Sequence, residues 1–357
     1  MSSELEQRLE GLLAECPEPD PGAEAEALHR ALRALRPGEV PHRGLRAAVL
    51  ACAVAVVLLV IAAGSLAAVG ALRVSLGTKS KPARPTPELT LPTGANGVAA
   101  IVDGRLSVVT RGGFFSRVPA TASALSPRAL YVAAGIGNAL VVKAPDGRLA
   151  WSHPVGGKVL AIAWAPDGFR IAYVVHAGHR YVLHLIYGNG IHDTVIDHSV
   201  RAVRPSWRGD SLAFAYVGAG GRAVVYDIGH ESRQVVAVFP PVTGVAFAPS
   251  GDALALAGTK GVSLVNHSAY RHIAAPNVEA FGWLNGRLGV AVPGMNSAVI
   301  RLFAPDGASR GSFRAQGVVK AISPNFVVTQ RGRNLIAGNT TLLTIRRGAA
   351  VRELRID

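Results

Sequence analysis

The chain has 357 residues, of which 49% are hydrophobic and 17% charged, with a formal net charge of +14. This composition excludes a largely disordered protein, and the lack of basic runs interleaved with aromatic residues argues against nucleic-acid binding. The only cysteines are Cys16 and Cys52. Everything after residue 52 must therefore be stabilised without a disulfide, by its hydrophobic core.

Residues 1–45 are predicted to form a short, acidic, helical tail with nine acids and five Arg. A first apolar helical face consists of Leu5, Leu9, Leu12 and Leu13, and a second of Leu28, Leu32 and Leu35. Asp20 is a plausible N-cap for the second helix, and the sequence CPEPDPG separates the two. Two alternatives stay open: a docking site for a cytoplasmic partner and a weakly ordered juxtamembrane tail.

Residues 46–73 are predicted to form one transmembrane helix, because Ala47 to Leu72 contains no charge and is long enough to cross a bilayer. Five Arg lie shortly before the span and four Lys or Arg follow it. This balance gives only slight guidance on orientation. We expect a single-pass protein of the cell membrane, with a cytoplasmic N-terminus and the large domain outside the cytoplasm.

Residues 74–93 are predicted to form an extended, Pro-rich linker, and residues 94–357 a large basic domain. From residue 89 onward there are 27 Lys or Arg against 13 Asp or Glu. Such a charge favours anionic partners, for example lipid headgroups or acidic polymers. It is also compatible with a soluble surface that carries surplus charge.

The large domain contains a repeat of about 40 residues. Each copy has an apolar strand, a tight turn and a second apolar strand, and the equivalent positions are Leu125, Trp164, Trp207, Phe247, Trp283 and Ile322. A degenerate copy surrounds Ile101. This period predicts an all-β fold, a seven-bladed β-propeller, with six blades and a loose N-terminal strand pair as the alternative. Each blade exposes two apolar faces that only neighbouring blades can cover, so the blades must close into a ring.

The copies at Trp164-Ala165-Pro166-Asp167-Gly168 and Phe247-Ala248-Pro249-Ser250-Gly251 resemble the TolB-type and WD-like propeller repeats. No blade ends in Trp-Asp, and no Gly-His pair opens one, so the sequence departs from the Trp-Asp repeat proper. The resemblance implies a propeller, a fold that hosts binding, scaffolding and enzymatic functions alike. The layout also resembles that of membrane-bound anti-sigma regulators, although their zinc-binding His and Cys motif is absent from residues 1–45.

Few residues in the repeat region suggest chemistry. The third repeat contains a group of polar residues that could hold zinc, but we interpret them as loop and strand-end residues: His176, His179, His184, His192, His198, Asp193 and Asp197. The turn acids Asp103, Asp167, Asp210 and Asp252 are expected to accept backbone hydrogen bonds rather than bind calcium or catalyse. The Gly-rich segment 217–225 is expected to be a hairpin loop rather than a phosphate cradle. The aromatic residues at the repeat position are expected to pack between blades rather than stack on sugars.

The sequence therefore predicts no catalytic, cofactor-binding or metal-binding residue. We expect a non-enzymatic, membrane-anchored binding or scaffolding module, sensory or regulatory in the manner of an anti-sigma protein. Its protein partner would bind at the loop-bearing end of the propeller or at the axial opening. Two alternatives stay open: a metal-dependent hydrolase or lyase, and a structural envelope protein that binds anionic polymers.

Overall fold

The computed structural model describes residues 89–237, 241–266 and 269–357. The predicted tail and transmembrane helix, and most of the predicted linker, lie outside these residues. Within the described part of the chain, no helix is long and apolar enough to cross a membrane. The described residues belong to one compact unit, Pro85–Asp357.

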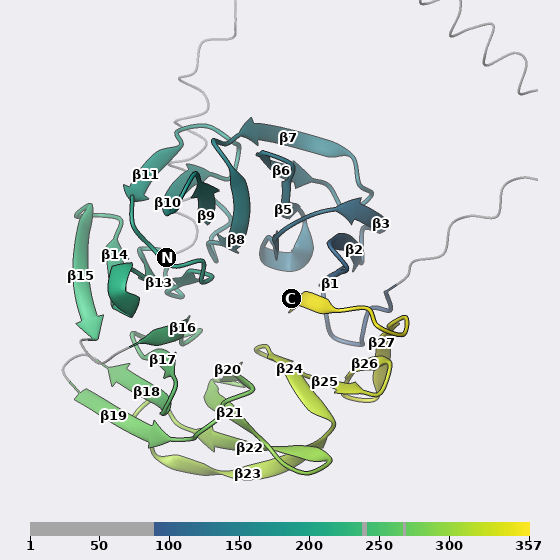
Figure 1. Ribbon diagram of the computed structural model, residues 1–357, viewed down its shortest axis with the longest axis vertical. Coiled ribbons are helices and arrows are strands. Elements are labelled where there is room, and N and C mark those ends of the chain that lie inside the picture. The colour runs from purple at the N-terminus through teal and green to yellow at the C-terminus, as the bar shows by residue number, and fades with distance from the viewer. Residues whose placement is uncertain (1–88, 238–240, 267–268) are drawn as a thin grey trace, which may run out of the picture. The chain divides into compact units, whose positions relative to one another are not determined.

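Seven four-stranded antiparallel sheets form the blades, and they follow one another around a central axis (Figure 1). From the axis outward, the first four blades are β28 (Val351–Ile356), β1 (Gly97–Val102), β2 (Arg105–Thr110) and β3 (Gly113–Pro119); β4 (Ser123–Leu125), β5 (Val132–Ile136), β6 (Ala139–Lys143) and β7 (Leu149–Pro154); β8 (Lys158–Trp164), β9 (Arg170–Ala177), β10 (Arg180–Tyr187) and β11 (Thr194–Asp197); and β12 (Ser206–Trp207), β13 (Ala213–Val217), β14 (Ala223–Asp227) and β15 (Ser232–Ala237). The remaining three are β16 (Val242–Phe247), β17 (Leu254–Gly258), β18 (Gly261–Asn266) and β19 (Ala269–Ala274); β20 (Ala280–Leu284), β21 (Arg287–Pro293), β22 (Ser297–Phe303) and β23 (Ser309–Gln316); and β24 (Val318–Ile322), β25 (Val327–Arg331), β26 (Asn334–Ala337) and β27 (Thr340–Thr344). We number the blades 1 to 7 in this order.

The seven-bladed prediction is confirmed, and the six-bladed alternative is wrong. The N-terminal strand pair β1 and β2 is not loose, because it forms a complete blade with β3 and with the last strand of the chain, β28. Val98 pairs with Ile356 and Ala100 with Leu354 across this junction. The ring is therefore closed by a sheet that joins the two ends of the described chain.

The repeat positions fall where the sequence placed them, with one correction. Leu125, Trp164, Trp207, Phe247 and Ile322 each end the innermost strand of a blade, and Trp283 lies one residue before such an end. Ile101 is different, because it lies on β1, the second strand of blade 1. The innermost strand of blade 1 is β28, so the equivalent position there is Ile356.

The hydrophobic core is divided among the junctions between blades. The buried apolar residues described here form seven clusters, each built from two neighbouring blades. Strand β9 shows how one sheet supplies two clusters: Ala172 and Val174 pack towards blade 4, whereas Ile171, Tyr173 and Val175 pack towards blade 2. This alternation follows from the two-residue period of a strand. It confirms that each sheet is covered on both faces by its neighbours.

The innermost strand of each blade has one edge that is unpaired within its own sheet. Hydrogen bonds from neighbouring blades stabilise this edge. Among the described residues, such a bond is present at six of the seven junctions. In each, a side chain of one blade forms a hydrogen bond with the backbone of the innermost strand of an adjacent blade. The pairs are Glu353 with Ser123 N, Thr121 with Val159 O, Trp207 with Ala163 O, Ser206 with Phe247 N, Trp283 with Ala246 O, and Glu279 with Val319 N. These bonds satisfy edge groups that would otherwise lack partners.

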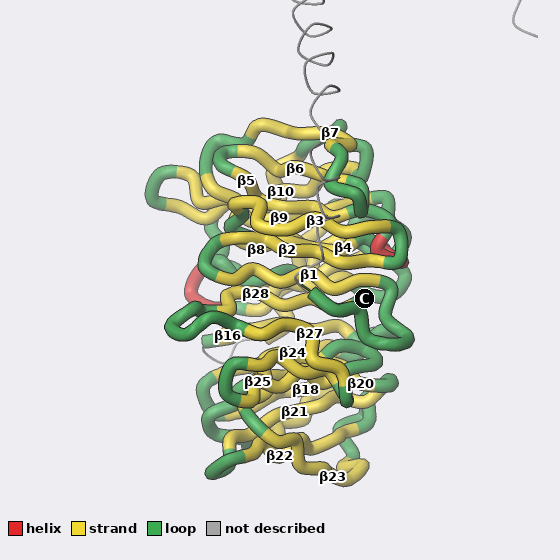
Figure 2. The backbone as a smooth tube through the Cα atoms, turned by 90° about the vertical axis from the view of Figure 1, so that its right-hand side faces the viewer, coloured by secondary structure: helices red, strands yellow, loops and turns green. Residues whose placement is uncertain are grey.

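The strand order gives the ring two different faces. Connections between first and second strands and between third and fourth strands lie at one face, and the remaining connections lie at the other. The short 3-10 turns η1 (Pro127–Ala129) and η2 (Ala219–Gly221) mark the two faces and lie on opposite edges in Figure 2.

Candidate functional site

The four aromatic residues at the repeat position are buried core residues, as expected. Trp164, Trp207, Phe247 and Trp283 are each at most 9% exposed. The indole N–H of Trp207 donates to the carbonyl of Ala163 at 3.0 Å, so its ring also joins blade 4 to blade 3. A stacking platform for sugars is inconsistent with this degree of burial.

The polar residues of blade 3 separate into different environments. His184 and Asp193 come together, with 3.0 Å between Nδ1 and Oδ2, and the buried Tyr173 hydroxyl donates to the other oxygen of Asp193 at 2.7 Å. His153 of blade 2, which the sequence did not indicate, lies 3.4 Å from the same carboxylate. This group therefore links β7 to the loop before β11.

The remaining members of the predicted group lie elsewhere. His176 packs against Tyr181 and His192 against Tyr187, while Asp197 accepts a hydrogen bond from Tyr216 of blade 4 at 2.8 Å. His179 and His198 are exposed. In the described ranges, no three His, Cys, Asp or Glu side chains are arranged to hold a metal ion.

The Asp193 carboxylate is surrounded by donors, and its ionisation reflects this. Burial favours the protonated acid, but the hydrogen bonds from His184 and Tyr173 outweigh it and hold the pKa of Asp193 below its ordinary value. Burial and the neighbouring carboxylate raise the pKa of Tyr173 well above its ordinary value. The arrangement links two blades through one carboxylate that three side chains contact.

The turn acids bond to the backbone or to Arg. Asp167 accepts from the N–H of Phe169 at 2.8 Å, and Asp210 accepts from that of Leu212 at 2.9 Å. Asp103 instead accepts from the N–H of Ala350, just before β28, and Asp252 pairs with Arg208 of blade 4. The Gly-rich segment 217–225 is the β13–β14 hairpin with its η2 turn, as expected.

One face of the ring carries an unusual number of exposed apolar side chains. Among the described residues, thirteen large hydrophobic side chains are exposed, and seven of these lie in or beside the turns of blades 2 to 4 at the face marked by η1. We call this surface the apolar face; it consists of Leu130, Tyr131, Leu149, Phe169, Tyr187, Ile191 and Leu212. Exposed apolar groups gathered in this way are typical of an interaction site.

A cavity of about 1040 Å³ opens beside three of these residues, at the tips of blades 2, 3 and 4. Its lining includes Tyr131 and Trp151 of blade 2, Phe169 and Tyr187 of blade 3, and Glu231 of blade 4. Aromatic side chains therefore form much of its wall. Three adjacent blades contribute, so its shape depends on the closed ring.

The turns that present these side chains are held firmly. Phe169 is 72% exposed, yet its backbone carbonyl accepts from Gly188 N at 2.7 Å. The carbonyl of Gly188 in turn accepts from the indole N–H of Trp151 at 2.8 Å. At Gly190, φ is +85° and an added Cβ would come within 2.8 Å of the Trp151 ring. Only glycine fits this conformation and this close approach.

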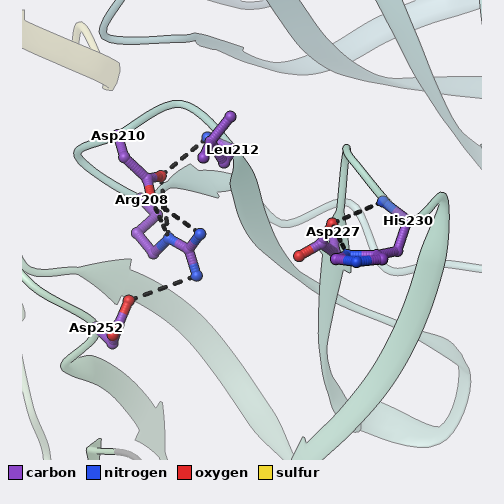
Figure 3. A network of polar contacts seen from close by, with 6 residues as sticks. All are labelled: Arg208, Asp210, Leu212, Asp227, His230 and Asp252. Carbon is purple, nitrogen blue, oxygen red and sulfur yellow. Dashed lines mark hydrogen bonds and ion pairs between the residues drawn. The ribbon is translucent and has the colours of Figure 1, made fainter.

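A polar network holds the edge of the apolar face between blades 4 and 5 (Figure 3). Arg208 contacts Asp210 at 2.8 Å through Nη2 and Asp252 of blade 5 at 3.4 Å through Nη1. Asp210 also caps the N–H of Leu212, which is 51% exposed. Figure 3 further shows His230 held by Asp227 in the neighbouring turn. The single Arg208 therefore contacts two carboxylates, one in its own turn and one in blade 5.

The axial opening has a different character. A cavity of about 430 Å³ is bounded by the innermost strands, and both Arg204 and Arg355 line it. Arg355 pairs with Glu353 at 2.9 Å, and Arg204 donates to the carbonyl of Ile162 at 3.0 Å. Burial, with a smaller effect of Arg355, lowers the pKa of Arg204 to about 9, so it stays charged at neutral pH. The opening therefore presents two Arg, one of which is paired with Glu353.

Comparison with known proteins gives similarity of fold only. No protein-family model matches the chain, and no curated protein matches its sequence. The crystal structure of TolB from Acinetobacter baumannii is similar with 14% identity and a TM-score of 0.44, over 65% of this chain and 69% of that chain. The structure of putative TolB from Agrobacterium tumefaciens is similar with the same identity and TM-score, over 64% of this chain and 92% of that chain. The number of blades rests on the strand pairing of this chain.

Proposed function

We propose that this chain is a non-enzymatic, membrane-anchored binding module whose propeller holds a protein partner on its apolar face. The observation that carries the proposal is the concentration of seven exposed apolar side chains on the turns of three consecutive blades; of these, Tyr131, Phe169 and Tyr187 also line one cavity. Rigid turns that display aromatic side chains lose little conformational freedom on binding. Phe, Tyr and Trp are also the side chains that most often dominate interface energies.

A protein fits this face better than a small ligand. Phe169 and Leu212 are 72% and 51% exposed, so a large part of each side chain is open to solvent even though Phe169 also lines the cavity. Their burial requires a partner surface that is itself concave at those points and that also fills the cavity beside Phe169. At the edge of this face the charge of Arg208 is held by Asp210 and Asp252. We therefore propose a partner segment with aliphatic or aromatic anchors rather than a strongly charged one.

A binding role is supported over catalysis by the state of the polar groups. The group most similar to a catalytic arrangement joins Tyr173, Asp193 and His184, and each of these has a protein partner within hydrogen-bond distance. The Tyr173 ring is fully buried between blades 2 and 3. Such a group positions two blades, and its central carboxylate is already in contact with three side chains of the protein.

The cellular arrangement in this proposal rests on the sequence. The uncharged segment 47–72 would anchor the chain, the acidic tail would lie in the cytoplasm, and the propeller would lie outside it. Binding at the apolar face could then be relayed to a partner of the tail, as in membrane-bound regulators. Topology mapping with a reporter fused at either end of the full chain tests this orientation.

Photocrosslinking in native membranes tests the binding face. A photoreactive residue replaces Phe169 in the full chain, and a matched control replaces Met295, which is 101% exposed on the opposite face. We expect a discrete protein adduct from position 169 that is absent from position 295 and is lost when Tyr131→Ser and Tyr187→Ser are added. An adduct of twice the chain mass would identify a second copy as the partner. Equal adducts from both positions, or none at position 169, would contradict the proposal.

A further inference from the structure

We propose that the face opposite the apolar face docks on an anionic lipid surface. The exposed Lys and Arg of this face would contact the lipid headgroups. This face carries the connections between second and third strands and between successive blades. Eleven exposed Lys and Arg lie in these connections or at the adjoining strand ends. We call them the basic face: Arg105, Lys158, Arg180, Arg201, Arg222, Lys260, Arg331, Arg333, Arg346, Arg347 and Arg352.

The acids at this face do not neutralise it. Among the described residues, only three acids lie in these connections or at the adjoining strand ends: Asp103, Asp197 and Glu279. Each accepts a hydrogen bond from the protein itself. The donors are Ala350 N, the Tyr216 hydroxyl and Val319 N. Eleven cations against three acids leave a strong positive field, whereas at the other face Arg170 and Arg208 are paired with aspartates.

The cations are densest where the described chain begins. Six of the eleven belong to blades 7 and 1 or to the connection between them: Arg105, Arg331, Arg333, Arg346, Arg347 and Arg352. At the same junction Leu89 is buried and the N–H of Thr90 donates to the carbonyl of Leu342 at 2.8 Å. From Asn96, beside the C-terminal Asp357, the chain therefore leads back along this junction towards the basic face.

A cavity of about 790 Å³ lies at this junction. Arg105, Arg117 and Arg346 line it together with three Thr and one acid, Asp103, which accepts a hydrogen bond from Ala350 N. Guanidinium and hydroxyl groups are the donors that bind phosphate oxygens. The cavity offers a place for one headgroup, and the surrounding Arg residues offer attraction to a charged leaflet.

The length of the chain before residue 89 favours a lipid surface over a soluble polyanion. Residues 74–88 separate the predicted span from the propeller, and fifteen residues reach at most about 50 Å when fully extended. The propeller is thereby kept close to a bilayer, with its tether attached at the junction richest in Arg. This inference does not depend on the apolar-face partner, since the two surfaces share no residue.

Hydrogen exchange of the full chain in nanodiscs tests the proposal. Discs of phosphatidylcholine are compared with discs that contain phosphatidylglycerol. We expect slower exchange with anionic lipid in segments 103–106, 331–334 and 345–352, no change in segments 166–170 and 188–192, and loss of the difference at about 0.5 M salt. Equal exchange in both lipids, or protection of the apolar face instead, would overturn the proposal.

A charge-matched pair of variants completes the test. Arg346→Gln, Arg347→Gln and Arg352→Gln together should abolish the lipid-dependent protection, because each cation near an anionic leaflet contributes about a fivefold factor to binding and three contribute about a hundredfold. Arg111→Gln, Arg148→Gln and Arg310→Gln remove the same charge from the other face and should leave it intact. An equal loss in both variants would indicate a net-charge effect and overturn the proposal. Protection by a soluble polyphosphate but not by anionic discs would do the same.

Discussion

Closure of the ring by the last strand of the chain gives a quantitative prediction at Leu354. This side chain is 5% exposed and packs in the cluster between blades 7 and 1. Truncation of a buried Leu to Ala removes apolar burial and leaves a cavity, at a cost of about 2–5 kcal/mol. For Leu354→Ala we expect about 3 kcal/mol. At about 2–4 °C per kcal/mol for a domain of roughly this size, the Tm should fall by about 6–12 °C.

Tryptophan fluorescence of the full chain in detergent measures this change, because all four tryptophans of the sequence lie in the propeller: Trp151, Trp164, Trp207 and Trp283. The matched control is Leu149→Ala, since Leu149 is 57% exposed and its truncation should change stability by less than about 0.5 kcal/mol. If Leu354→Ala behaved like Leu149→Ala, β28 would not close the ring, and the reasoning would be refuted.

Three further substitutions probe the blade junctions and the apolar face. Trp207→Phe removes the indole bond to the carbonyl of Ala163 and should cost about 1–3 kcal/mol in denaturant titration; an unchanged midpoint would contradict the role of that bond. Gly190→Ala places a methyl group against the Trp151 ring at a positive φ. We expect the free energy of unfolding to fall by about 1–3 kcal/mol and the crosslinked adduct to become weaker. Wild-type values for both would exclude the predicted strain. Asp193 has a lowered pKa, so the stability it provides is complete above its unfolded pKa of about 3.9 and is lost as the pH falls through its lower folded pKa. Asp193→Asn should therefore destabilise the protein at pH 7 and much less at about pH 2–3, and an equal difference at both pH values would show that the carboxylate charge is not responsible.

The architecture followed from the sequence because each blade repeats one local signal. The turn after Trp164 and the turn after Phe247 both place a positive-φ Gly between two apolar strands, and that signal depends only on nearby residues. The closing strand has no such signal. The segment VRELRI pairs with residues about 255 positions earlier, so its place in blade 1 depends on a long-range contact. For this reason the copy near Ile101 was assigned to the wrong strand.

The polar group of blade 3 was predicted in part. His184 and Asp193 lie on one hairpin, so their proximity was within reach of the sequence. His153 belongs to another blade, and its distance from Asp193 depends on how two sheets pack. Spacing along the chain contains no information on such packing.

The apolar face was missed, although a local signal for it exists. Phe169 and Leu212 each immediately precede the second strand of a blade. They follow a turn directly, at a position where polar residues are usual. The sequence alone can indicate each such residue but does not show that several of them share one surface. Their significance as one surface comes from the ring, which places three blades side by side (Figure 1).

The two faces are proposed to have different partners, and one measurement tests this most directly. Photoreactive residues are placed in the full chain at Phe169 on the apolar face and at Arg347 on the basic face, and the adducts formed in native membranes are identified by mass. We predict a protein adduct at position 169 and lipid adducts at position 347. Lipid adducts at position 169, or the same protein adduct at both positions, would contradict the account.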